Sequence, residues 1–172
     1  EPMPFMLRDV MTYSSNLTDV RKVIKDAVGT NSYVFMMTDG KTGEAELYVK
    51  DRERFLAFQP GVVLEDGKEY IPAIKDISYG GRFNDKLTAQ LSANYGQLTP
   101  ETFMKIVPEV AMKSNFQNVI YEPKGLRFWV SNAKSKSVWA ASQPYTFFDF
   151  GKALAEYQLE SAGAESALEK SK

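Results

Sequence analysis

The chain has 172 residues, of which 44% are hydrophobic and 13% aromatic, enough to bury the core of one globular domain. Its 21 Lys and Arg nearly balance 22 Asp and Glu, which excludes a general attraction to nucleic acid or anionic lipid. Histidine and cysteine are both absent. This excludes Ser/His/Asp triads, Cys/His dyads and the common zinc sites, and we expect neither a metal nor a cofactor.

No run approaches the roughly 18 apolar residues of a membrane span, so the sequence predicts a soluble chain without one. The start, Glu1-Pro2, lacks the basic and apolar regions of a signal peptide. Since position 1 is not Met, three origins stay open: a processed subunit, a mature form after signal removal, or a trimmed chain. The lack of cysteine fits the cytosol and an oxidising compartment equally, so export stays among the alternatives.

The first predicted element is a helix that begins behind Asn16 and ends at Gly29. Its apolar residues recur at helical spacing, and they are Leu17, Val20, Val23, Ile24 and Ala27. A β-hairpin follows, with strands over 32–38 and 44–50 joined by a turn at 39–43. A further strand is expected over 54–58.

The second half of the chain is predicted to contain two helices and another hairpin. Helices are expected from Asn84, where Leu87, Leu91 and Tyr95 lie four residues apart, and from Pro100, which Thr99 can cap. The clearest hairpin has strands over 118–121 and 126–130, around a Glu-Pro-Lys-Gly turn. A third strand over 138–141 would complete a meander.

This order of elements predicts an α+β fold with a mainly antiparallel sheet. We expect a single α+β domain over residues 1–150 and a C-terminal helix over 151–172 that frays after Gly163. A Rossmann-type fold is disfavoured, because no glycine-rich turn opens a helix within a strand-helix-strand unit.

The most suggestive loop for function is 79–84. Its glycines, Gly80 and Gly81, could expose backbone N–H groups, while Arg82 and Asn84 add donors for a carboxylate, phosphate or oxyanion. The alternative interpretation, which we favour from the residues alone, is an ordinary turn in which Asn84 caps the next helix.

A second candidate, Asn115, lies in the polar run 114–118 directly before an apolar strand, where it could present hydrogen-bond donors at a sheet end. Asx-turn chemistry explains the same run equally well. Residues 134–137, Lys-Ser-Lys-Ser, resemble a Ser/Lys dyad, but adjacent residues in a polar loop are better interpreted as solvated.

Two other groups are interpreted as structural. Glu44 and Glu46 share one face of a strand and are expected to be exposed, because the buried face comes from the residues between them. The aromatic residues of the last third are expected to form core, not a base-stacking platform; they are Trp129, Trp139, Tyr145, Phe147, Phe148 and Phe150.

Segments 4–10, 16–20 and 30–40 together resemble the later half of cysteine-dependent N-terminal-nucleophile (Ntn) hydrolases of the penicillin acyltransferase-like family. Segment 30–40 reads Thr-Asn-Ser-Tyr-Val-Phe-Met-Met-Thr-Asp-Gly. The similarity continues more loosely through 96–101 and through 115–123 followed by 126–130. It covers about two thirds of the chain and rests on the order of moderately specific segments.

The resemblance implies an αββα sandwich, of which this chain would form part, and a precursor that cleaves itself to expose an N-terminal Cys. The family's Cys would lie upstream of residue 1, on a missing N-terminal segment or subunit. Its oxyanion asparagine is expected near 79–84, so Asn84 is a catalytic candidate by proximity, and Asn115 is a second candidate by its position before a strand. Gly80, Gly81 and Arg82 are the substrate-binding candidates. The segment 79–84 departs from the family pattern.

The resemblance therefore implies the C-terminal portion of an acyltransferase or amide hydrolase that acts on linear C–N bonds of a small amide or acyl substrate. The isolated chain is expected to be inactive, and an unpaired sheet edge is expected to drive it into a homo-oligomer unless the missing piece is present. The alternative is a non-catalytic α+β module that binds a ligand or another protein.

Overall fold

The computed structural model describes residues 1–65, 70–80 and 84–169, with the backbone alone at 84 and 162–169. The chain divides into two compact units, Glu1–Val110 and Ala111–Lys172. The first unit contains α1 Met3–Tyr13, α2 Leu17–Asp26, β1 Tyr33–Asp39, β2 Glu44–Lys50, β3 Phe55–Phe58, β4 Leu64–Glu65, β5 Tyr70–Ile71, α3 Asn84–Ala93 and α4 Pro100–Val110. The second contains β6 Gln117–Glu122, the 3-10 turn η1 Pro123–Gly125, β7 Arg127–Asn132, the 3-10 turn η2 Ala140–Ser142, β8 Thr146–Asp149 and α5 Phe150–Glu169.

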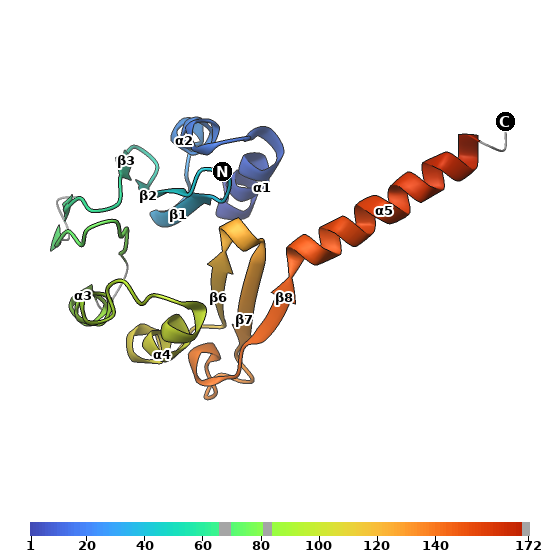
Figure 1. Cartoon of the computed structure of the whole chain (residues 1–172). Coiled ribbons are helices and arrows are strands. Elements are labelled where there is room, and N and C mark those ends of the chain that lie inside the picture. Colours follow the sequence, from blue (N-terminus) through green and yellow to red (C-terminus); the bar gives the residue numbers. More distant parts are fainter. Residues whose placement is uncertain (66–69, 81–83, 170–172) are drawn as a thin grey trace. The chain divides into compact units, whose positions relative to one another are not determined.

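Two helices cover one face of the antiparallel sheet β1-β2-β3 (Figure 1). The start of α2 is fixed as predicted, because the side chain of Asn16 accepts a hydrogen bond from the Asp19 N–H at 3.0 Å. The helix ends at Asp26, before the expected Gly29. The core between the helices and the sheet contains Met6 and Val10 of α1, Val20 and Ile24 of α2, Phe35 of β1 and Tyr48 of β2.

The opposite face of β2 is also apolar and buried. Leu47 and Val49 pack there with Leu64, Ile71, Tyr79 and Leu91. Central strands covered on both faces are buried along their length, and every residue of β2 from Glu46 to Lys50 is buried. Alternate side chains of β2 therefore point to two faces of the sheet, and both faces are covered.

The outer strand of this sheet is only partly covered. β1 pairs with β2 alone among the described residues, which leaves its other edge unpaired there. Val34 and Met36 lie on the same face as Leu47 and Val49, yet they are 54% and 46% exposed. An apolar face and an open edge thus meet at β1.

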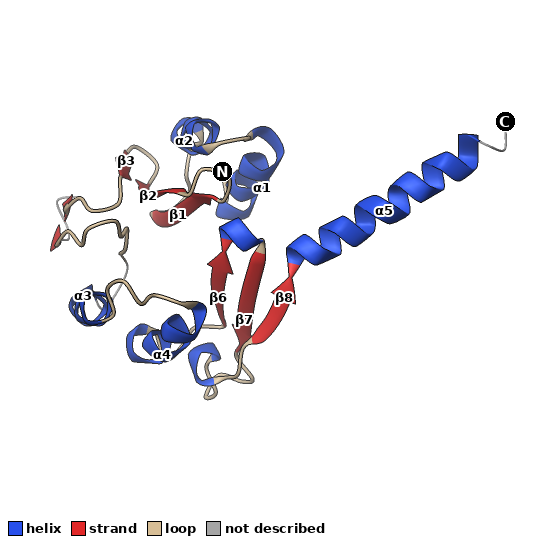
Figure 2. Ribbon diagram, in the orientation of Figure 1, coloured by secondary structure: helices blue, strands red, loops and turns tan. Residues whose placement is uncertain are grey.

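The second unit is an antiparallel sheet in the order β6-β7-β8, followed by α5 (Figure 2). The predicted hairpin around residues 122–125 is confirmed, with η1 as its turn. Leu126 adopts a left-handed conformation at φ 50°, which lets the chain reverse directly after the turn. The C-terminal helix begins at Phe150, and Figure 1 shows it leading away from β8.

Two predictions for this unit are wrong. The third strand is β8 over 146–149, because residues 135–138 close a tight turn and 140–142 form η2. Several aromatic residues expected in the core are about half-exposed, since a three-stranded sheet with few covering elements cannot bury both of its faces. They are Phe147, Phe148 and Phe150.

Candidate functional site

The polar run before β6 forms a hydrogen-bonded corner at the end of the sheet. The side-chain amide of Asn115 donates to the Gln117 carbonyl at 2.8 Å and to Asn118 Oδ1 at 2.6 Å. Asn118 faces Ser131 across the β6-β7 pairing. Both N–H groups of Asn115 are thus engaged, and an oxyanion would have to displace one of these acceptors to be bound by this amide.

Polar atoms without partners gather at this corner. Asn115 Oδ1, Asn118 Nδ2, Ser131 Oγ and Tyr145 OH are buried without a hydrogen bond. Burial raises the pKa of Tyr145, and the neighbouring Ser131 hydroxyl partly offsets that rise, although the two groups miss hydrogen-bond geometry. Buried polar atoms in native proteins are nearly always paired, so such a concentration marks a candidate functional site. We call these four residues the buried polar cluster.

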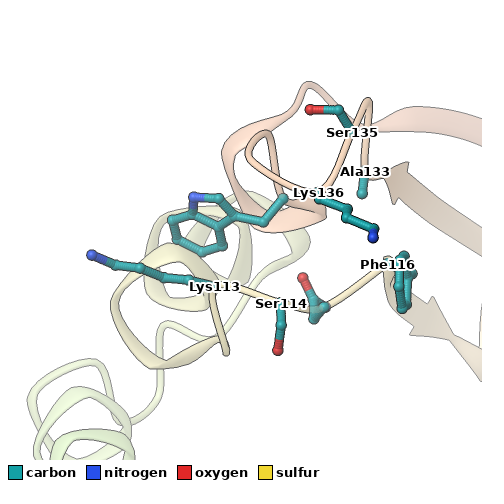
Figure 3. Close-up of a pocket in the computed structure, with 8 residues that line it drawn as sticks. Lys113, Ser114, Phe116, Ala133, Ser135 and Lys136 are labelled. Carbon is teal, nitrogen blue, oxygen red and sulfur yellow. The ribbon is translucent and has the colours of Figure 1, made fainter.

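A pocket of about 270 Å³ opens beside this cluster (Figure 3). It is lined by Lys113, Ser114, Asn115, Phe116, Ala133, Ser135, Lys136 and Trp139. Two backbone hydrogen bonds join its walls, from the Ala133 N–H to the Phe116 carbonyl at 2.8 Å and from the Ala140 N–H to the Asn115 carbonyl at 3.2 Å. The walls are therefore held together by main chain.

The predicted loop 79–84 is described only in part. Gly80 lies against the second core of the first unit, where an added Cβ would meet Leu47 Cδ1 at 3.3 Å and Ile71 Cδ1 at 3.4 Å. The glycine therefore serves close packing there. Gly81 and Arg82 lie outside the described residues, and Asn84 is the first residue of α3. Asn84 and Asn115 belong to different units.

The interpretation of Glu46 as an exposed residue is wrong. Its side chain accepts hydrogen bonds from Arg21 of α2, from the Tyr48 hydroxyl and from Gln59, and the residue is only 5% exposed. The sheet can bury this carboxylate because donors from three side chains replace its water. Glu44, at the open end of the strand, is exposed as expected.

The same contacts set the ionisation of Glu46. Burial alone would raise the pKa of its carboxyl, but the hydrogen bonds from Arg21, Tyr48 and Gln59 outweigh burial and hold the pKa below its ordinary 4.5. Burial and the adjacent carboxylate raise the pKa of the Tyr48 hydroxyl further above neutrality, and the hydroxyl donates to that carboxylate. This network ties α2 to the sheet.

Two tyrosine-to-phenylalanine variants should differ in their effect on the free energy of unfolding. Tyr145→Phe removes a buried hydroxyl without a partner, so we expect unchanged or higher stability, by up to about 1 kcal/mol. Tyr48→Phe removes a donor to a carboxylate and should lower the free energy of unfolding by about 1.5–3 kcal/mol. Urea unfolding of both variants measures the difference, and a comparable loss in Tyr145→Phe would show that its hydroxyl is paired.

The sequence interpretation missed most of the pocket. The loop 134–137 is exposed as predicted, and Trp139 is only partly buried; Lys136 and Trp139 nevertheless line the cavity together with Asn115. Of the lining residues, only those in the run 114–118 are predicted to present hydrogen-bond donors. The available signal was the polar run 114–118, but its partner, the loop 133–139, is nearly twenty residues away, and strand pairing brings the two together.

These observations define an α+β protein with antiparallel sheets. Comparison of the chain with protein-family models, with curated proteins and with solved structures gives no match. No helix in the described part of the chain combines the length and apolar character needed to cross a bilayer. Within residues 1–65, 70–80 and 84–169, no three His, Cys, Asp or Glu side chains gather closely enough to hold a metal ion.

Proposed function

We propose that this chain is the C-terminal portion of an Ntn-type acyltransferase or amide hydrolase that acts on linear C–N bonds. The observation that carries the proposal is the layering of the first unit. Helices α1 and α2 cover one face of an antiparallel sheet, and the other face is apolar, with Val34 and Met36 open on β1. At β2 this face is already covered, but a second sheet packed on its open part at β1 would give the sheet-on-sheet core of an αββα sandwich.

The chemistry of an N-terminal nucleophile also suits this composition. The attacking group uses its own α-amino group as the general base, so the reaction needs no histidine. In the proposal an upstream segment supplies the Cys that this chain lacks. This chain would supply sheet, pocket walls and hydrogen-bond donors to the assembled enzyme.

Hydrolysis of p-nitroanilides tests the proposal. The purified 172-residue chain alone should release no p-nitroaniline above background, because it has no Cys nucleophile. Joined to its upstream segment it should turn over, and replacement of the N-terminal Cys by Ala should abolish that turnover. Hydrolysis by the isolated chain would refute the requirement for an upstream nucleophile.

A non-catalytic binding module is the second candidate, and an exposed aromatic row favours it. Tyr121, Phe128 and Phe148 stand side by side across β6, β7 and β8, with ring centroids 6.1 and 5.0 Å apart. Tyr121 is 69% exposed. Such a row can contact a ligand or another protein. Upstream coding sequence without an in-frame Cys would favour this function over the enzyme.

A further inference from the structure

The pocket beside the buried polar cluster carries positive charge that no carboxylate balances. Lys113 and Lys136 line it, and no Asp or Glu does. Neither lysine forms an ion pair within the described ranges of the chain. In Figure 3 the Lys136 side chain extends toward Phe116, whereas Lys113 points away from Lys136. An anion in the pocket would therefore meet Lys136 as its principal positive charge.

Apolar and hydroxyl groups complete the lining. Phe116 and Trp139 supply aromatic walls, and Phe116 is 76% exposed although it flanks a cavity. Among the described residues the Ser114 hydroxyl has no hydrogen-bond partner, so it can donate to a ligand. By contrast, the Ser135 hydroxyl lies 3.2 Å from Ser137 Oγ and is already engaged. The pocket thus combines an apolar surface with a cation and a free hydroxyl.

We propose that this pocket binds a small flat aromatic carboxylate, independently of the function proposed above. The ring would cover the exposed faces of Phe116 and Trp139, and the carboxylate would take its charge partner from Lys136 and a hydrogen bond from Ser114. A cavity of about 270 Å³ has room for one or two fused rings.

Binding of 2-naphthoate to the full chain tests the proposal. The chain has two tryptophans, so Trp129→Phe leaves Trp139 as the only reporter, and its fluorescence should be quenched by the ligand. In that background we expect 2-naphthoate to bind about fivefold more tightly than the uncharged 2-naphthamide. Raising the salt concentration should narrow this difference.

Two lysine variants test whether Lys136 supplies the positive charge that binds the carboxylate. Lys136→Ala should weaken binding of 2-naphthoate about fivefold and leave 2-naphthamide unchanged, so the preference for the acid disappears. Lys124→Ala is the matched control, since Lys124 is exposed in η1, at the other end of the β6-β7 hairpin. Equal affinity for acid and amide, equal losses in both lysine variants, or no quenching at millimolar ligand would each overturn the proposal.

Discussion

Replacement of Glu46 by alanine should lower the free energy of unfolding by about 2–4 kcal/mol. The variant leaves the Tyr48 hydroxyl buried without an acceptor and removes the carboxylate that holds Arg21 of α2 on the sheet. The Arg21 side chain is 45% exposed and can return to water, which keeps the loss below that of a fully buried pair. Urea unfolding followed by circular dichroism gives the value.

Glu44→Ala is the control, because Glu44 lies two residues away on the same strand and is exposed. Its replacement should change stability by less than about 0.5 kcal/mol. Similar losses in the two variants would contradict the burial of Glu46.

The stability of the folded chain at acid pH should also depend on the Glu46 carboxylate. The pKa of Glu46 is lower in the folded chain than its ordinary 4.5, so its contribution to stability is complete above about pH 4.5. The contribution is lost as the pH falls through the lower folded-state pKa, where the carboxylate becomes protonated. In Glu46→Gln the fall in stability below pH 4.5 should be shallower than in the unmodified chain.

The second large effect is expected at Phe35. Phe35→Ala should cost about 3–5 kcal/mol, because this side chain is 7% exposed and lies in the core beneath α1 and α2. Val34→Ala, at the adjacent residue on the opposite face of β1, should cost less than about 1 kcal/mol, since Val34 is 54% exposed. Thermal unfolding of both variants measures the ratio, and equal losses would contradict the one-sided burial of β1.

Local signals predicted much of the fold. The cap at Asn16 and the hairpins around residues 39–43 and 122–125 follow from residue types that favour these structures. Helix α1 was not predicted, although Met6 and Val10 lie one helical turn apart behind Pro2. Two buried positions are too few to give a clear helical pattern, and they are buried only because the helix covers the sheet.

Burial of charge could not be predicted in the same way. The alternation of charged and apolar residues in β2 is typical of a strand with one exposed face. Glu46 is buried only because Arg21 and Gln59, which are distant in sequence, donate hydrogen bonds to it. The pocket has the same origin, since it depends on pairing between β6 and β7. Long-range contacts decide both features, and neither leaves a periodic signal.

N-terminal sequencing of every polypeptide that co-purifies with this chain from its natural source tests the proposed function most directly. We predict a companion segment whose first residue is Cys, generated by cleavage of a precursor that also encodes this chain. A protein purified as a single polypeptide that begins at Glu1, with no companion, would lack the required nucleophile and contradict the assignment to an Ntn-type enzyme.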